Sequence, residues 1–74
     1  MKETTVVNNL KQFRKQGKKL TQQEMADIVG VSRQSINAIE KGKFLPSITT
    51  ALRIAEYFNV PVEEIFYLED DKSV

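Results

Sequence analysis

Residues 22–41 contain two short apolar patterns with helical spacing, joined at Gly30. The apolar or small positions are Met25, Ala26, Val29, Val31, Ile36 and Ile39. An α-helix advances about 100° per residue, so the polar side chains of the second half share an arc of about 100° across the axis from Ile36 and Ile39. These polar residues are Arg33, Gln34, Asn37 and Lys41. The pattern predicts two packed helices, the second of which presents a compact surface rich in hydrogen-bond donors.

Capping residues set the limits of the first three predicted helices, and a glycine follows each of them. Recurring apolar positions predict a first helix over residues 6–16. The capping-box sequence T-Q-Q-E at residues 21–24 begins a second helix over 22–29. Ser32 caps the third helix, which runs to about residue 41.

Two more helices follow a loop at residues 43–46. Ser47 caps the fourth helix, whose predicted apolar stripe consists of Ile48, Ala51, Leu52, Ala55 and Phe58. Pro61 begins a short fifth helix with inward-facing Val62, Ile65 and Phe66. Without a competing strand pattern, the predicted fold is all-α, with five short helices.

The same pattern divides the chain into one domain and two ends. We expect a flexible N-terminus over residues 1–5, a folded domain over 6–68 and an acidic disordered tail over 69–74.

Composition excludes several classes of protein. Cysteine and histidine are both absent, so disulfides and zinc sites built from these ligands are impossible, and the commonest general base is missing. We therefore expect no metal, no cofactor and no enzymatic activity. No apolar run approaches the ~20 residues that a membrane span needs, and no secretory signal pattern begins the chain, so we expect a cytoplasmic protein.

Charge is distributed unevenly along the chain. Residues 1–20 carry six basic residues and one acidic residue, and residues 21–46 carry three of each. Residues 47–74 carry two basic and six acidic residues, so the three segments contribute +5, 0 and −4 to the net charge of +1. Such a chain can present a positive face to phosphate, although two ordinary solvated surfaces would give the same counts.

A family resemblance covers about residues 8–67, nearly the whole chain. The run L-T-Q-Q-E-M-A-D-I-V-G-V-S-R-Q-S-I-N-A-I-E-K-G-K resembles the helix-turn-helix of phage repressor and Cro proteins, the XRE family. The following P-S-I-T-T-A-L-R-I-A-E-Y-F-N-V-P-V-E-E-I-F is similar to the fourth and fifth helices of that family. The loop at residues 17–19 is one residue longer than its commonest form. The resemblance implies a lambda-repressor-like DNA-binding domain with the helix-turn-helix at helices 2 and 3.

The resemblance implies base-reading roles for Arg33, Gln34, Asn37 and Ala38. Arginine can donate two hydrogen bonds to guanine O6 and N7, whereas glutamine or asparagine can pair with adenine N6 and N7. Ala38 could contact a thymine methyl group or could serve only as a good helix former.

A second set of residues is implied to contact DNA phosphates, namely Gln22, Ser32, Ser35, Lys41, Lys43 and the amide of Phe44. For Ser35, a hydroxyl that packs between helices is an equal alternative, and each lysine could be a solvated charge. The resemblance also implies a structural ion pair between Arg14 and Glu40, which would neutralise an acidic residue beside the DNA-facing surface.

These features predict a sequence-specific DNA-binding transcriptional regulator, a repressor that inserts helix 3 into the major groove. A homodimer would read a palindromic operator with half-sites roughly 34 Å apart, or a multiple of that distance. Candidate dimer contacts are Phe66, Tyr67 and Leu68, with Val6 and Val7, although these residues could equally close the monomer core.

The alternative function is a protein-interaction module, such as an antitoxin or a phage adaptor. The polar recognition face argues against it, because protein anchors are usually aromatic or apolar.

Overall fold

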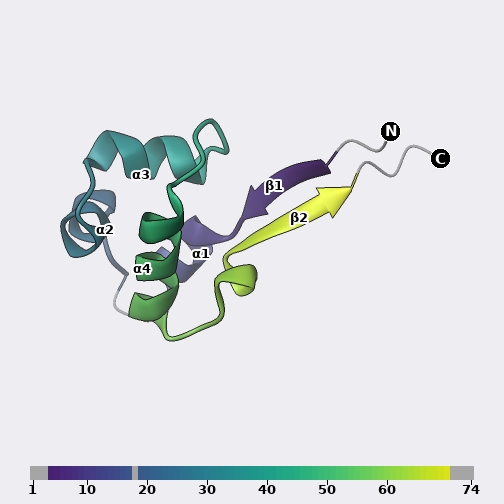
Figure 1. Ribbon diagram of the computed structural model, residues 1–74. Coiled ribbons are helices and arrows are strands. Elements are labelled where there is room, and N and C mark those ends of the chain that lie inside the picture. The colour runs from purple at the N-terminus through teal and green to yellow at the C-terminus, as the bar shows by residue number, and fades with distance from the viewer. Residues whose placement is uncertain (1–3, 18, 71–74) are drawn as a thin grey trace.

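The computed structural model describes residues 4–17 and 19–70. Four helices gather at one end of the molecule, and two strands form a ribbon that projects from them (Figure 1). The elements are β1 (Thr4–Asn8), α1 (Leu10–Lys15), α2 (Gln22–Val29), α3 (Arg33–Glu40), α4 (Ile48–Phe58), the 3-10 turn η1 (Val62–Glu64) and β2 (Phe66–Asp70). The fold is mostly helical, as the sequence predicted, and the described residues form four α-helices rather than five.

The strands are the main difference from the predicted elements. Residues 6–8 belong to β1 and not to the first helix, which begins at Leu10. β1 and β2 pair in antiparallel register, with Val6 opposite Leu68 and Val7 opposite Tyr67. β-branched valines favour a pleated strand, but the pairing partner lies about 60 residues away in the sequence, so helical periodicity alone cannot reveal it.

The predicted fifth helix is shortened to the single turn η1. Ile65 is buried, whereas Val62 and Phe66 are half-buried and Phe66 already begins β2. A segment of this length gains little from helical hydrogen bonds, and the ladder to β1 offers its backbone groups other partners.

The expected flexible ends are also partly corrected. Thr4 and Thr5 are strand residues of β1, opposite Asp70 and Glu69 of β2. The rest of the predicted ends, residues 1–3 and 71–74, lies outside the described residues.

One apolar core joins all four helices to the turn before β2. It is formed by Leu10, Met25, Ala26, Val29, Ile36, Ile39, Ile54, Ala55 and Ile65. Ala26 is fully buried where α2 packs on α3, and only a small side chain allows two helices to approach closely. The core therefore fixes α3 through its buried isoleucines and leaves its other face outside.

Two consecutive asparagines connect the ribbon to the helices. The Asn8 side chain donates from Nδ2 to the Ile39 carbonyl at 2.8 Å, and its Oδ1 accepts from the Leu10 amide at 3.1 Å. The Asn9 amide donates to the Ile65 carbonyl at 2.8 Å, and Asn9 Nδ2 donates to the Glu64 carbonyl at 3.2 Å. These bonds lie where β1 ends and α1 begins. They attach the end of the ribbon nearest the helices to the last turn of α3.

Candidate nucleic-acid interface

The turn between α2 and α3 is fixed by local hydrogen bonds and one special backbone angle. Thr21 Oγ1 accepts from the Glu24 amide at 3.0 Å while Glu24 Oε1 accepts from the Thr21 amide at 2.8 Å, which completes the predicted capping box. Gly30 ends α2 with φ of 80°, a left-handed conformation that glycine adopts without steric cost. α3 then begins directly after Ser32, whose hydroxyl accepts from the Ser35 amide at 3.0 Å.

α3 has two chemically distinct faces. Ile36 and Ile39 are fully buried, whereas Arg33 and Gln34 in its first turn are exposed. Asn37, one turn further, is half-buried, and so is Ala38. In Figure 1, α3 runs along an outer side of the helical end, and its last turn lies on the side nearest the ribbon. The structure thus places the four predicted base-reading residues on one element, with the two at its start the most accessible.

A polar network joins α1, α2 and α3 beneath this surface. Arg14 donates from Nε to Glu40 Oε2 at 2.6 Å and from Nη2 to Glu40 Oε1 at 3.1 Å, so the pair implied by the resemblance is present. Arg14 Nη1 also donates to the Leu20 carbonyl at 2.8 Å. The side chains of Arg14 and Glu40 are only 8% and 4% exposed, so solvent screens this bidentate pair little.

Gln22 belongs to this network through both N–H groups of its side-chain amide. Nε2 donates to Glu40 Oε1 and to Asn37 Oδ1, each at 3.1 Å. A phosphate oxygen is an acceptor, so the predicted contact from this side chain to phosphate would require Nε2 to give up one of these bonds.

The other predicted phosphate contacts lie around the two ends of α3. Ser32 Oγ donates to Ser35 Oγ at 3.0 Å, so these hydroxyls pair with each other at the start of the helix. Lys41, Lys43 and Phe44 are exposed after its end, where the Lys43 amide donates to the Ala38 carbonyl at 2.9 Å. The lysine side chains are therefore positioned near the C-terminal end of α3.

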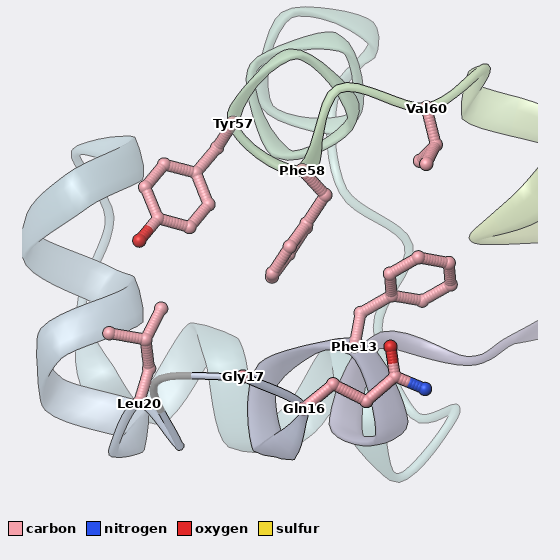
Figure 2. Close-up of a pocket in the computed structure, with 7 residues that line it drawn as sticks. All are labelled: Phe13, Gln16, Gly17, Leu20, Tyr57, Phe58 and Val60. Atoms are coloured by element: carbon pink, nitrogen blue, oxygen red, sulfur yellow. The ribbon is translucent and has the colours of Figure 1, made fainter.

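A separate hollow of about 630 Å³ opens between α1, the α1–α2 loop and the end of α4. Figure 2 shows Phe13 and Phe58 on the two helices that line the hollow, and their rings are tilted by 53° with centroids 5.4 Å apart. The remaining lining residues are Gln16, Gly17, Leu20, Tyr57 and Val60. This lining contains no carboxylate, lysine or arginine, so it supplies neither a general acid–base pair nor a charged anchor.

Metal-ligand clusters and membrane-spanning helices are both absent from residues 4–17 and 19–70. No group of three or more acidic side chains there could hold a metal ion. No helix there is long and apolar enough to cross a membrane.

Comparison with known proteins identifies the fold and its family. The family model described as helix-turn-helix matches residues 10–65, which span α1 to the end of η1 and include the α2–Gly30–α3 unit. The chain belongs to the helix-turn-helix family. This match confirms the resemblance to XRE-family proteins that the sequence showed.

Similar helix-turn-helix proteins occur in archaea and bacteria. The chain is 55% identical over 53 residues to an uncharacterised HTH-type transcriptional regulator of Methanocaldococcus jannaschii, covering 72% of this chain and 80% of the relative. It is 41% identical over 51 residues to the uncharacterised HTH-type transcriptional regulator YgzD of Bacillus subtilis, covering 69% of this chain and 77% of that protein. The solution structure of the SOS-response transcriptional repressor LexA from Eubacterium rectale matches with a TM-score of 0.70 and 34% identity, over 89% of this chain and 67% of that chain.

Sequence reasoning missed the part that Asn8 plays in positioning the helix-turn-helix. Its amide binds the backbone of α3 from a strand that the periodicity assigned to a helix. The available signal was the Asn8–Asn9 pair itself, since asparagine favours caps and turns over helix interiors.

Proposed function

We propose that this helix-turn-helix chain is a sequence-specific DNA-binding transcriptional regulator that inserts α3 into the major groove and has no enzymatic activity. The main support for this proposal is the contrast between the two faces of α3. α3 buries Ile36 and Ile39 and exposes Arg33 and Gln34 in its first turn. Long donor-bearing side chains exposed at the start of a helix match the base edges of the major groove. The names of the relatives, HTH-type transcriptional regulators, support the same function.

Backbone contacts would come from the residues that flank α3. Exposed Lys41 and Lys43 follow α3, and the Ser35 hydroxyl and the Phe44 amide supply neutral donors. The Ser32 hydroxyl would contact phosphate by giving up its bond to Ser35 Oγ. Phosphate contacts fix the register of a protein on DNA, while base contacts specify the sequence. Ala38 lies beside Asn37 and would contact a thymine methyl group.

A homodimer is the form that we propose for binding. A groove of about 180 Å³ between the ribbon and the start of α4 is lined by Val6, Leu45, Pro46, Ile48, Ala51 and Phe66. Leu68 extends this apolar face, because it lies directly opposite Val6 in the ribbon. Ile48 and Leu68 are 79% and 69% exposed, which is unusual for large aliphatic side chains gathered on one face of a monomer.

A second copy of the chain is the occupant that this apolar face fits. One small module buries only about 600–1,000 Å² of its surface on DNA, so a two-fold dimer doubles the contacts available for affinity. Two-fold symmetry also brings the same apolar face from both copies together. The operator would then be palindromic, with half-sites roughly 34 Å apart or a multiple of that spacing.

Repression is the direction that we propose for regulation. A bound dimer can exclude another protein from overlapping DNA without any further contact, whereas activation needs an additional surface for a partner. A reporter gene downstream of the selected operator checks this directly, and expression that rises with the protein would contradict it.

Selection of bound sequences from a random DNA pool tests the central proposal. We expect an enriched palindrome whose affinity falls steeply as salt rises, because counterions released from phosphates drive binding. No enrichment, or an affinity that is independent of salt, would overturn the proposal in favour of a protein-interaction module.

A further inference from the structure

The side chains of Arg14, Glu40, Gln22 and Asn37 form one continuous hydrogen-bonded chain from the core to the outer face of α3. The bonds run from Arg14 to Glu40, from Gln22 to Glu40, and from Gln22 to Asn37, with donor–acceptor distances of 2.6 to 3.1 Å. Only the last member, Asn37, is a predicted base-reading residue. The chain therefore connects a buried ion pair to the surface that would meet DNA.

The chemistry of its members fixes the direction of every bond in this chain. Ionised Glu40 can only accept, so Gln22 must turn its Nε2 group, and not its oxygen, toward Glu40. The second N–H of the same nitrogen can only donate, so Asn37 must turn Oδ1 toward Gln22. Amide orientations are often ambiguous, but here the carboxylate at one end determines both of them.

The bond from Gln22 to Asn37 Oδ1 determines which group of the Asn37 side-chain amide remains available. With Oδ1 held by Gln22, the Nδ2 group and its two N–H donors form the remaining edge. Among residues 4–17 and 19–70, no group accepts a hydrogen bond from Asn37 Nδ2. Asn37 is half-buried at mid-helix, so this donor edge has a fixed position relative to Arg33 and Gln34.

We propose that Gln22 is a positioning residue for DNA specificity, which holds Asn37 so that its Nδ2 donors read a hydrogen-bond acceptor on a base edge. This inference rests on the proposed function, and it replaces a phosphate contact by the Gln22 side chain. A phosphate contact would strengthen binding to all sequences alike, whereas a fixed amide edge affects one base pair. The two roles are therefore separable by measurement.

The experiment compares two matched substitutions on α2. Gln22→Met removes the donors but keeps the length and helix propensity of the side chain. Gln23→Met makes the same change at an exposed neighbour whose side chain donates to Asp27 Oδ1 at 2.9 Å, outside the Arg14–Glu40–Gln22–Asn37 chain. Both variants are made with and without Asn37→Ala, and affinity is measured for the selected operator and for each single-base change in it.

We expect Gln22→Met to reduce discrimination by about tenfold at the one base pair where Asn37→Ala also reduces it, a size typical of one base contact. In the Asn37→Ala background, Gln22→Met should have no further effect on discrimination, and Gln23→Met should have none in either background. Equal weakening of all sequences by Gln22→Met, regardless of Asn37, would overturn the inference. A wild-type chain without any sequence preference would overturn the proposed function itself.

A second measurement uses the free protein and does not depend on the Gln22 variant. In isotope-labelled chains, Asn37→Ala should shift the nuclear magnetic resonance signals of the Gln22 side-chain N–H₂ group and leave those of Gln23 in place. Unchanged Gln22 signals would overturn the inference, because the bond to Asn37 would then be absent in solution.

Discussion

Arg14 is a charged residue with only 7% of its surface exposed, and its side chain donates hydrogen bonds to a carboxylate and to a backbone carbonyl. Its guanidinium binds both oxygens of Glu40 and the Leu20 carbonyl, so it ties α1 to the end of α3 and to the loop before α2. Removal of one partner from such a pair leaves the other as an uncompensated buried charge. The pair thus holds the end of α3 against α1.

Arg14→Ala should reduce the free energy of unfolding by about 3–5 kcal/mol, because Glu40 then loses its counter-ion in a site that solvent barely reaches. Urea unfolding followed by circular dichroism measures the change. Lys15→Ala, at the exposed neighbouring position, should change it by less than about 0.5 kcal/mol. The double variant Arg14→Met, Glu40→Met should recover part of the loss, and equal stability of wild type and Arg14→Ala would contradict a buried pair.

Arg33 is the residue that we expect to contribute most to base discrimination. It is exposed at the first position of α3, where a guanidinium can bind guanine O6 and N7. Arg33→Ala should cost about 1–3 kcal/mol of binding free energy and relax the preference at one base pair. Competition binding against operators with single-base changes measures this effect. As a contrast, Lys43→Ala should weaken the affinity for all DNA sequences alike and reduce the salt dependence of binding. Intact sequence preference in Arg33→Ala would contradict the assigned reading face.

At the scale of elements, Gly30 decides how α2 and α3 are joined. Its φ of 80° lies in the left-handed region, and a Cβ placed there would meet only Arg53 Nη1 at an ordinary distance of 3.5 Å. The requirement for glycine is therefore conformational rather than a lack of space.

Gly30→Ala should accordingly reduce the free energy of unfolding by about 1–2 kcal/mol, the cost of a left-handed conformation for an L-residue. Gly30→Asn should cost less, because asparagine adopts that conformation more readily. Thermal unfolding of the three chains checks this order. Equal losses for Ala and Asn would indicate a steric clash instead.

At the scale of the whole molecule, the ribbon and α4 together form the apolar face that we propose for the dimer. Ile48→Glu should convert the dimer to a monomer, as measured by sedimentation equilibrium, with little change in monomer stability because 79% of this side chain is already exposed. Ile28→Glu on α2, which is 43% exposed and is not among the residues that line this face, is the matched control. A wild-type chain that stays monomeric at tens of micromolar, with and without operator DNA, would contradict the dimer.

The sequence predicted the helix-turn-helix well because its determinants are local. The capping box, Gly30 and the Ser32 cap lie within residues 21–35, and α2 spans residues 22–29 as predicted. The buried positions Met25, Val29 and Ile36 follow from helical spacing alone.

The ribbon could not be predicted from such patterns. Val6 and Leu68 pair across nearly the full length of the chain, and each strand is too short to be stable without its partner. The exposure of Ile48 and Leu52 could not be predicted either. An apolar stripe on a helix does not indicate which part of the stripe the rest of the domain covers.

By itself the sequence determined the two helices of residues 22–41, their caps and the donor-rich face that contains Arg33 and Gln34. All of these features depend on residues within one or two helical turns of one another. The tertiary structure alone decided how that face is supported. Packing of α1, α2 and α3 brings Arg14, Gln22 and Glu40 together beneath Asn37, and the direction of hydrogen bonds in this group depends on side chains that meet only in the folded chain. The same long-range packing paired residues 4–8 with residues 66–70 as a ribbon.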